Sequence, residues 1–156
     1  MASALILHNI RSVHNVGSIF RTADAAGVSK VLLSGYTPAP VDRFNLPRKD
    51  FSKVSLGAEK TIPWEQTKTL AAAVSRLKKE GFYIVAVEQD KSSSSLFEFK
   101  GPKDKPLALV LGNEVRGVSK QSLKLVDAIV EIPMRGKKES LNVSVAAGIA
   151  TFVLLQ

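Results

Sequence analysis

The sequence predicts an α/β domain in which a mainly parallel β-sheet is covered by helices on both faces. Two observations support this fold class. Short runs of nearly continuous Val, Leu and Ile, typical of strands buried on both faces, recur along the chain, and segments with helical periodicity separate them. No internal repeat or linker interrupts the 156 residues, which is an ordinary length for one domain.

The first elements are a strand, a helix and a second strand. Residues 4–9 (ALILHN) form an apolar run suited to a buried strand, and residues 10–15 form the turn after it. Residues 16–26 carry apolar side chains on one helical face, and Gly27 is placed to end this helix. Residues 30–34 (KVLLS) predict the next strand.

The middle of the chain is less regular. Residues 35–50 contain several prolines and predict a loop. Residues 51–63 fit no single pattern and could include a short strand around Val54. Residues 65–80 have apolar side chains at helical spacing and are followed by Gly81, so we expect a helix there.

The second half of the chain continues the alternation of strands and helices. Residues 82–87 (FYIVAV) and 107–111 (LALVL) predict strands, and the polar residues 92–95 between them predict a flexible loop. Residues 112–117 form a turn. A short helix over residues 119–126 follows, with its first serine as the N-cap.

The last segment combines a strand, a basic loop and a helix. Residues 128–132 predict the final strand, and residues 135–138 (RGKK) form the loop. Ser140 and Asn142 are candidate N-caps, because their side-chain oxygens can accept hydrogen bonds from the free N–H groups of a first helical turn. From Val143 onward the chain is apolar or small almost throughout, so we expect this helix to be buried on most of its surface.

Composition excludes several kinds of site and location. The chain has no cysteine, which rules out disulfides and Cys-based zinc sites, and its only histidines are His8 and His14, so we expect no metal. It has no apolar run of about eighteen residues to span a membrane, and its N-terminus lacks the pattern of a signal peptide. We therefore expect a cytoplasmic protein with no membrane partner.

The charge balance indicates a polyanionic partner. The formal net charge is +8, and the cations are spread over many loops. Each phosphate that a lysine or arginine neutralises releases a condensed counterion, so a nucleic acid is the leading candidate. The loop cations that we expect at the surface are Arg43, Arg48, Lys49, Arg135, Lys137 and Lys138.

Three stretches lie just after predicted strands, where open α/β sheets bind ligands. The first is residues 15–21 (NVGSIFR), where Asn15 is expected to open the helix. Arg21 is a permanent cation in a segment otherwise built for burial. It therefore either faces a phosphate or carboxylate, or extends to solvent from the helix flank.

The other two stretches are residues 111–119 (LGNEVRGVS) and 132–142. In the former, Gly112 and Gly117 allow the backbone to approach a ligand closely, and Glu114 places an anion beside them. The glycine spacing matches neither a P-loop nor a dinucleotide-binding fingerprint. In the latter, the basic loop joins a strand end (IPM) to the polar start of the last helix (SLN).

Taken in this order, the patterns NxGxxxR, LGNExxGxS and IPM…SLNVSVAxGI closely resemble the three motifs of the TrmH-like (SpoU) branch of the SPOUT RNA methyltransferases. The resemblance covers nearly the whole chain and implies one SPOUT methyltransferase domain over residues 1–156, with no separate RNA-binding extension. It implies a C-terminal trefoil knot, a rare exception to the rule that chains do not thread loops. It also implies S-adenosyl-L-methionine as methyl donor and a homodimer whose active site is shared between subunits.

The resemblance assigns site residues in two groups. The residues implied in catalysis are Arg21, Asn15, Glu114 and Asn142. The residues implied in cofactor binding are Gly112, Asn113, Ile132, Met134, Ser140 and Leu141. Several of these would act through backbone groups that hold the adenine and the ribose.

The implied function is S-adenosylmethionine-dependent methylation of a ribose 2′-hydroxyl in tRNA or rRNA. Arg21 would mainly orient the hydroxyl and stabilise the developing alkoxide, since a guanidinium gives up its proton only at great cost. A histidine can serve as a general base, but we expect His14 to be an exposed loop residue. The alternatives are a catalytically idle RNA-binding module of the same fold and a methyltransferase that acts on a base nitrogen.

Overall fold

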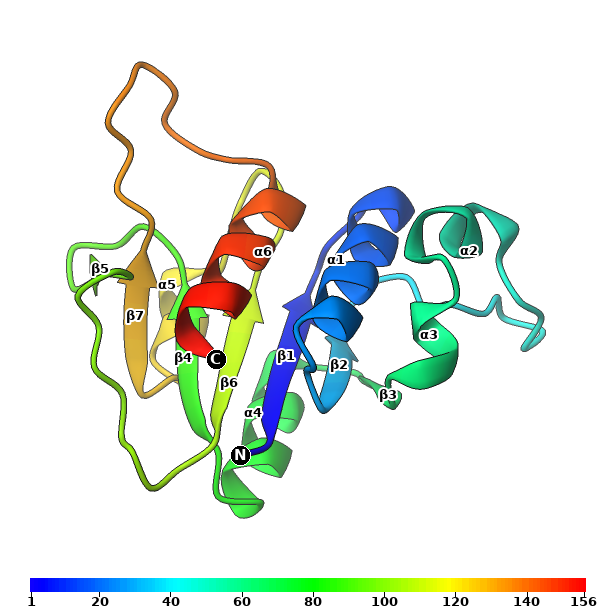
Figure 1. The fold of residues 1–156 in the computed structure, drawn as a ribbon, viewed down its shortest axis with the longest axis horizontal. Helices are drawn as coiled ribbons and strands as arrows, with labels where there is room; N and C mark the ends of the chain where they lie inside the picture. The colour runs from blue at the N-terminus through cyan, green and yellow to red at the C-terminus, as the bar shows by residue number, and fades with distance from the viewer.

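The computed structural model describes all 156 residues, which form one sheet with helices on both faces (Figure 1). Seven strands lie in the order β3-β2-β1-β6-β4-β7-β5, and every neighbouring pair is parallel. The strands are Ser3–His8 (β1), Lys30–Ser34 (β2), Trp64–Thr67 (β3), Tyr83–Val87 (β4), Ser94–Ser95 (β5), Leu107–Leu111 (β6) and Ala128–Glu131 (β7). The predicted fold class is confirmed, whereas the trefoil knot stays a prediction.

Six helices pack on this sheet. They are Val13–Ala25 (α1), Lys49–Ser55 (α2), Ala58–Thr61 (α3), Leu70–Lys79 (α4), Lys120–Leu123 (α5) and Val143–Leu154 (α6). In Figure 1, α1 and α6 lie side by side on one face of the sheet, with α2 and α3 beyond α1, and α4 and α5 lie on the other face. None of the helices is long and apolar enough to cross a lipid bilayer.

Two hydrophobic cores fill the space between the sheet and its helices, one on each face. The larger core packs β-sheet residues such as Leu7 against Phe20 of α1 and Phe51 of α2, whose rings meet edge to face with centroids 5.2 Å apart. The smaller core packs Ile6 and its neighbours against Leu77 of α4. Successive strand residues thus face different cores, which explains why the strands are continuous apolar runs.

N-terminal caps decide where α1 and α6 begin. The hydroxyl of Ser12 accepts a 3.1 Å hydrogen bond from the backbone N–H of Asn15, so α1 begins three residues earlier than predicted and Asn15 does not open it. Asn142 caps α6 by accepting a 2.8 Å hydrogen bond from the backbone N–H of Ser144. Of the two predicted caps of this helix, Asn142 is therefore the one used and Ser140 is not.

Residues 49–67 differ most from the prediction. Helices α2 and α3 stand where the sequence fitted no single pattern and a short strand was one possibility around Val54, and Phe51 of α2 is fully buried against α1. The edge strand β3 pairs with β2. The helix predicted over residues 65–80 therefore begins only at Leu70, as α4.

Two further predictions were wrong in part. The predicted flexible loop at residues 92–95 contains β5, which pairs with β7. Helix α6 buries only one side in the single chain, where its buried residues are Ala147, Ala150 and Thr151. Three of its large apolar side chains remain 43–50% exposed, namely Val145, Phe152 and Val153. The prediction that α6 is buried on most of its surface is thus wrong for the single chain.

Candidate functional site

The strands that directly follow β1 in the chain, β2 and β3, lie on one side of it, and all later strands lie on the other side. The strand order therefore reverses between β1 and β6, and open α/β sheets bind ligands at such a switch point. Strand β1 pairs with β2 on one side and with β6 on the other. The loops that follow β1, β4, β6 and β7 all leave the same edge of the parallel sheet, at the top of Figure 1. The three stretches singled out in the sequence therefore meet at this edge of the sheet.

A cavity of about 330 Å³ opens at this edge of the sheet, next to the ends of β4, β6 and β7. Its volume lies within the range of small-molecule sites, roughly 300–1,000 Å³. Glu114 lines it, as do all six residues that the resemblance implies in cofactor binding, namely Gly112, Asn113, Ile132, Met134, Ser140 and Leu141. The stretches after β6 and β7 thus form the wall of one cavity.

Gly112 lies where the loop after β6 folds back on itself. A Cβ atom at this position would lie 2.6 Å from the carbonyl carbon of Gly117 and 2.7 Å from Cγ2 of Val118. Cβ atoms in proteins essentially never come so close to other atoms, so the loop can close in this way only around a glycine. The backbone of Gly112 therefore itself forms part of the cavity wall.

Glu88 fixes the other end of the same loop, a role that the sequence analysis missed. Its carboxylate accepts hydrogen bonds from the backbone N–H groups of Val118 at 2.9 Å and Gln89 at 3.0 Å. Gly117 has a φ of +63°, and a Cβ atom there would lie 2.1 Å from Oε2 of Glu88. The available signal was position, because Glu88 directly follows the strand predicted over residues 82–87.

Glu114 ties the loop after β6 to the loop after β1. Its carboxylate accepts hydrogen bonds from the backbone N–H groups of Arg11 and Ser12, both at 2.9 Å, and from the side-chain amide of Asn15 at 3.2 Å. Burial raises the pKa of Glu114, but these hydrogen bonds to the ionised form outweigh burial and leave the pKa below its ordinary value. The carboxylate is therefore a charged anchor at neutral pH and not a proton donor.

The side chain of Asn15 extends this network to α6. Its Oδ1 accepts a 3.3 Å hydrogen bond from the side-chain amide of Asn142. Three of the four residues implied in catalysis, Asn15, Glu114 and Asn142, are thus joined by hydrogen bonds although they come from three different stretches.

Asn113 fastens the loop after β6 to the loops after β1 and β2. Its side-chain amide donates to the carbonyl of Asn9 at 3.0 Å and to the hydroxyl of Tyr36 at 2.9 Å. Its side-chain oxygen accepts hydrogen bonds from the backbone N–H groups of Val115 and Arg116, both at 2.9 Å. The side chain of Asn113 therefore has no hydrogen-bonding group left for a ligand, so any contact would come from its backbone.

The loop over residues 132–142 forms the remaining wall and rises above the sheet in Figure 1. The backbone N–H groups of residues 134–141 donate no hydrogen bond within the chain and are free to meet a ligand. Gln89 holds the loop through a 2.7 Å hydrogen bond from its side-chain amide to the carbonyl of Glu139. The exposed cations of the loop are Arg135, Lys137 and Lys138.

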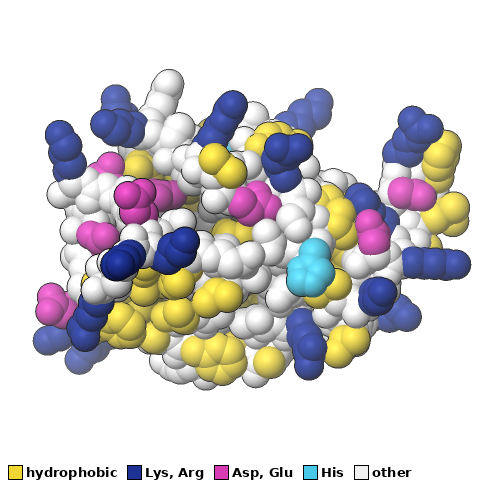
Figure 2. Space-filling view, turned by 90° about the horizontal axis from the view of Figure 1, so that it is seen from above, with side chains coloured by type: hydrophobic (Ala, Val, Ile, Leu, Met, Phe, Trp, Pro, Cys, Tyr) yellow, Lys and Arg dark blue, Asp and Glu magenta, His cyan; other side chains and the backbone are white.

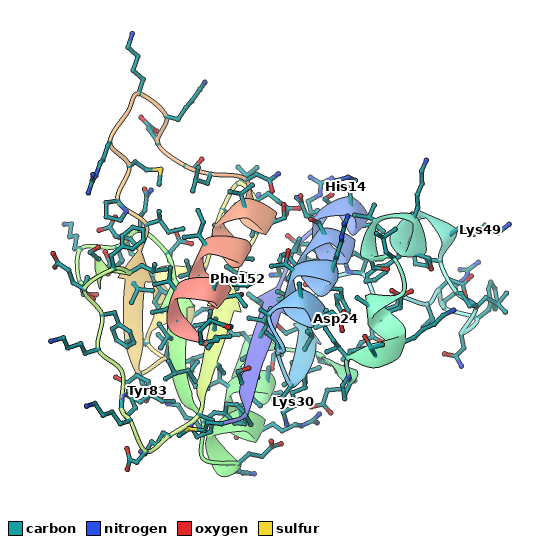
Figure 3. The ribbon with its side chains drawn as sticks, viewed as in Figure 1. His14, Asp24, Lys30, Lys49, Tyr83 and Phe152 are labelled. Atoms are coloured by element: carbon teal, nitrogen blue, oxygen red, sulfur yellow. The ribbon has the colours of Figure 1, made fainter.

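Arg21 and His14 do not line the cavity. Both lie on α1 with exposed side chains, and His14 stands near the upper end of this helix in Figure 3. His14 is therefore exposed as predicted, but it belongs to a helix and not to a loop. Arg21 forms no ion pair within the chain. The structure thus brings three of the residues implied in catalysis together and leaves Arg21 on the surface of α1, the helix that packs beside α6.

The chain is similar in sequence to proteins that are named as RNA methyltransferases. Residues 2–152 match the model of the SpoU rRNA Methylase family. The chain is 36% identical over 150 residues to the 23S rRNA (guanosine-2′-O-)-methyltransferase RlmB of Ralstonia nicotianae, covering 95% of this chain and 56% of that protein. The protein of the same name from Neisseria meningitidis serogroup B is 38% identical over 144 residues, covering 92% and 54%. The chain thus spans about half the length of these curated relatives.

Solved structures give the same assignment. An AdoMet-bound rRNA methyltransferase from Sinorhizobium meliloti superposes with a TM-score of 0.85 at 29% identity, covering 97% of this chain and 55% of that one. The TrmH/SpoU tRNA modifying enzyme of A. aeolicus superposes with a TM-score of 0.79 at 31% identity, covering 97% and 72%. Since the family model matches almost the whole chain and the fold agrees over 97% of it, the chain belongs to the SpoU rRNA methylase family.

Proposed function

We propose that the chain transfers a methyl group from S-adenosylmethionine to a ribose 2′-hydroxyl of tRNA or rRNA in the cytoplasm. The observation that carries the proposal is the cavity at the switch point, which two separate sequence motifs line together. The relatives support the reaction type, since the RlmB proteins are named for 2′-O-methylation of guanosine in 23S rRNA and the Sinorhizobium meliloti structure contains AdoMet.

The cavity residues suit S-adenosylmethionine, which supplies an electrophilic methyl group on a sulfonium when bound. Gly112, Ile132 and Leu141 offer backbone groups at the cavity wall for the adenine and the ribose. Carboxylates would complement the positive charges of the sulfonium and the ammonium groups. Four glutamates are among the residues that line the cavity, Glu88, Glu114, Glu131 and Glu139.

Arg21 is the residue that we assign to the ribose hydroxyl, which must lose its proton as it attacks. A guanidinium remains protonated in proteins, so Arg21 donates hydrogen bonds that orient the hydroxyl and stabilise the developing alkoxide. The proton then passes to a phosphate of the substrate or to water. Because Arg21 is exposed on α1 and does not line the cavity of its own chain, we place it at the cavity of a second chain.

The second chain is expected to dock on the face formed by α1 and α6. Hydrophobic side chains gather along the lower edge of Figure 2, the side on which these helices lie. Phe152, labelled on α6 in Figure 3, is 49% exposed. A symmetric contact would cover the same patch on both chains and would bury α6 on most of its surface, as its sequence predicts.

The proposed reaction can be tested directly. The purified chain is incubated with methyl-labelled S-adenosylmethionine and either rRNA or tRNA, and the digested nucleosides are separated by mass spectrometry. A labelled 2′-O-methyl nucleoside is the expected product. Cofactor binding in equilibrium dialysis without methylation would indicate an idle RNA-binding module, and a methylated base nitrogen would indicate the other branch of the superfamily.

Light scattering should return a homodimer of twice the 16.8 kDa chain mass at micromolar concentration. Phe152→Glu should shift the particle to a single chain, because dimerisation would then bury an unpaired charge. Leu56→Glu is the matched control, since Leu56 is 64% exposed and lies at the end of α2, outside the two helices that form this face. A 16.8 kDa particle for the unaltered protein would contradict the dimer.

RNA binding should depend steeply on salt, because the net charge of +8 makes phosphate contacts the main attraction. Affinity for a tRNA transcript, measured by filter binding, should fall roughly tenfold or more between about 50 and 200 mM salt. Replacing Lys137 and Lys138 with alanine should reduce the slope by about one for each phosphate contact that is lost. A flat salt profile would contradict electrostatic RNA binding.

A further inference from the structure

A short arm formed by residues 41–49 projects from the molecule, at the right edge of Figure 1 where the chain is coloured cyan. It lines no part of the cavity and has no role in the proposed reaction. It carries two large apolar side chains that are exposed to solvent, Phe44 at 68% and Leu46 at 59%. Contiguous exposed apolar patches with a polar rim mark interaction sites on proteins.

Hydrogen bonds within the arm hold it in one conformation. Val41 and Pro47 form an antiparallel bridge, and the backbone N–H of Asp42 donates to the carbonyl of Leu46 at 2.9 Å. One carboxylate oxygen of Asp42 accepts hydrogen bonds from the backbone N–H groups of Phe44 at 2.8 Å and Leu46 at 3.0 Å. The arm is thus pre-organised, which lowers the entropy lost when a partner binds to it.

Cations surround the apolar tip. The basic residues of the arm are Arg43, Arg48 and Lys49. Both nearby carboxylates are engaged, Asp42 by backbone N–H groups and Asp50 by the guanidinium of Arg48 at 3.1 Å. The guanidinium of Arg43 lies 4.8 Å from the ring centroid of Phe44. Figure 3 shows Lys49 extending outward from α2, and Figure 2 shows basic and hydrophobic side chains together at the right edge.

We propose that this arm is a second RNA contact, at which an unpaired base stacks on Phe44 while Arg43 and Lys49 hold the adjacent phosphates. An aromatic face stacks on any base, and a guanidinium can both pair with phosphate and stack. The exposure of Phe44 leaves room for a base beside Arg43. The positive tip on a protein of net charge +8 disfavours a second copy of this chain as the occupant.

The inference rests on the proposed function for RNA as the substrate, and it adds a contact outside the reaction site. The probe is a fluorescently labelled single-stranded oligoadenylate of about twelve nucleotides, a typical single-strand site size. Phe44→Ala should weaken its binding about tenfold in fluorescence anisotropy, and the slope of affinity against salt should not change, because stacking releases no counterions. A duplex RNA of equal length should bind both proteins alike, since its bases are not free to stack.

Phe97→Ala is the matched control, because Phe97 is 61% exposed and lies next to β5, at the opposite edge of the sheet. It should leave the affinity for oligoadenylate unchanged. A direct reporter is Phe44→Trp in a Trp64→Phe background, which removes the only tryptophan of the chain. Its emission should fall when oligoadenylate is added, whereas tryptophan introduced at position 97 in the same background should not respond.

Equal affinity of Phe44→Ala and the unaltered protein for oligoadenylate would overturn this inference and leave the proposed methyl transfer intact. A change of particle mass on Phe44→Ala in light scattering, with RNA affinity unaltered, would show that the arm contacts protein and would also overturn it. If the unaltered protein binds no RNA and methylates none, the proposed function fails together with this inference.

Discussion

Replacing Arg21 with alanine should slow methyl transfer to RNA a hundredfold or more, about 3 kcal/mol, while the affinity for S-adenosylmethionine stays nearly unchanged. Arg21 is exposed on α1 and does not line the cavity of its own chain, and at the cavity of the second chain we assign it to the ribose and not to the cofactor. Its loss should therefore affect the position of the ribose and not the binding of the cofactor. Single-turnover rates measure the transfer, and equilibrium dialysis measures the affinity. Lys79→Ala on α4 removes another exposed cation and should leave both unchanged.

Arg21→Lys separates two roles of this side chain. An amine gives up its proton more easily than a guanidinium, but it lacks the planar fork that can hold a hydroxyl and a phosphate together. We expect the lysine variant to be as slow as the alanine variant, because geometry is what Arg21 supplies. Substantial activity in the lysine variant would instead make proton abstraction the main role. If both variants lose the cofactor, or both stay fully active, the placement of the ribose at Arg21 is wrong.

The strands and the cavity could be predicted from the sequence for physical reasons. Strands buried on both faces are apolar at nearly every position, and this pattern located the ends of β1, β2, β4, β6 and β7 to within one residue. The predicted cavity residues follow β6 and β7, and ligands bind to open parallel sheets at the edge where the strands end. The motifs therefore lie at positions that the parallel topology of the sheet brings together.

Several features were missed because the element is too short to show a pattern, or because it depends on a contact between residues far apart in the sequence. Helices α2 and α3 have only 7 and 4 residues, too few to show a clear helical period. The edge strand β3 includes Glu65 and Gln66, which also suit the first turn of a helix, so only its pairing with β2 decides the outcome. Glu88 belongs to no local sequence motif. It acts by accepting a hydrogen bond from the backbone N–H of Val118, thirty residues later in the chain.

Gly112→Ala should abolish measurable binding of S-adenosylmethionine, the other large effect that we expect. The added Cβ would lie 2.6 Å from the carbonyl carbon of Gly117 and 2.8 Å from its oxygen. These are backbone atoms that cannot rotate away, so the whole loop over residues 112–118 has to move. That loop carries Glu114, whose hydrogen bonds hold the loop after β1 and Asn15.

One methyl group at residue 112 thus displaces a wall of the cavity and the network of Glu114 together. Overpacking of this kind costs about 1–3 kcal/mol, so the variant should still fold and should melt several degrees lower. Gly136→Ala is the control, since a Cβ there meets no atom within 4 Å although the residue lies in the neighbouring basic loop. Equilibrium dialysis and thermal unfolding measure the two effects. A folded Gly112→Ala protein that binds the cofactor as the unaltered chain does would place the cofactor elsewhere than in this cavity.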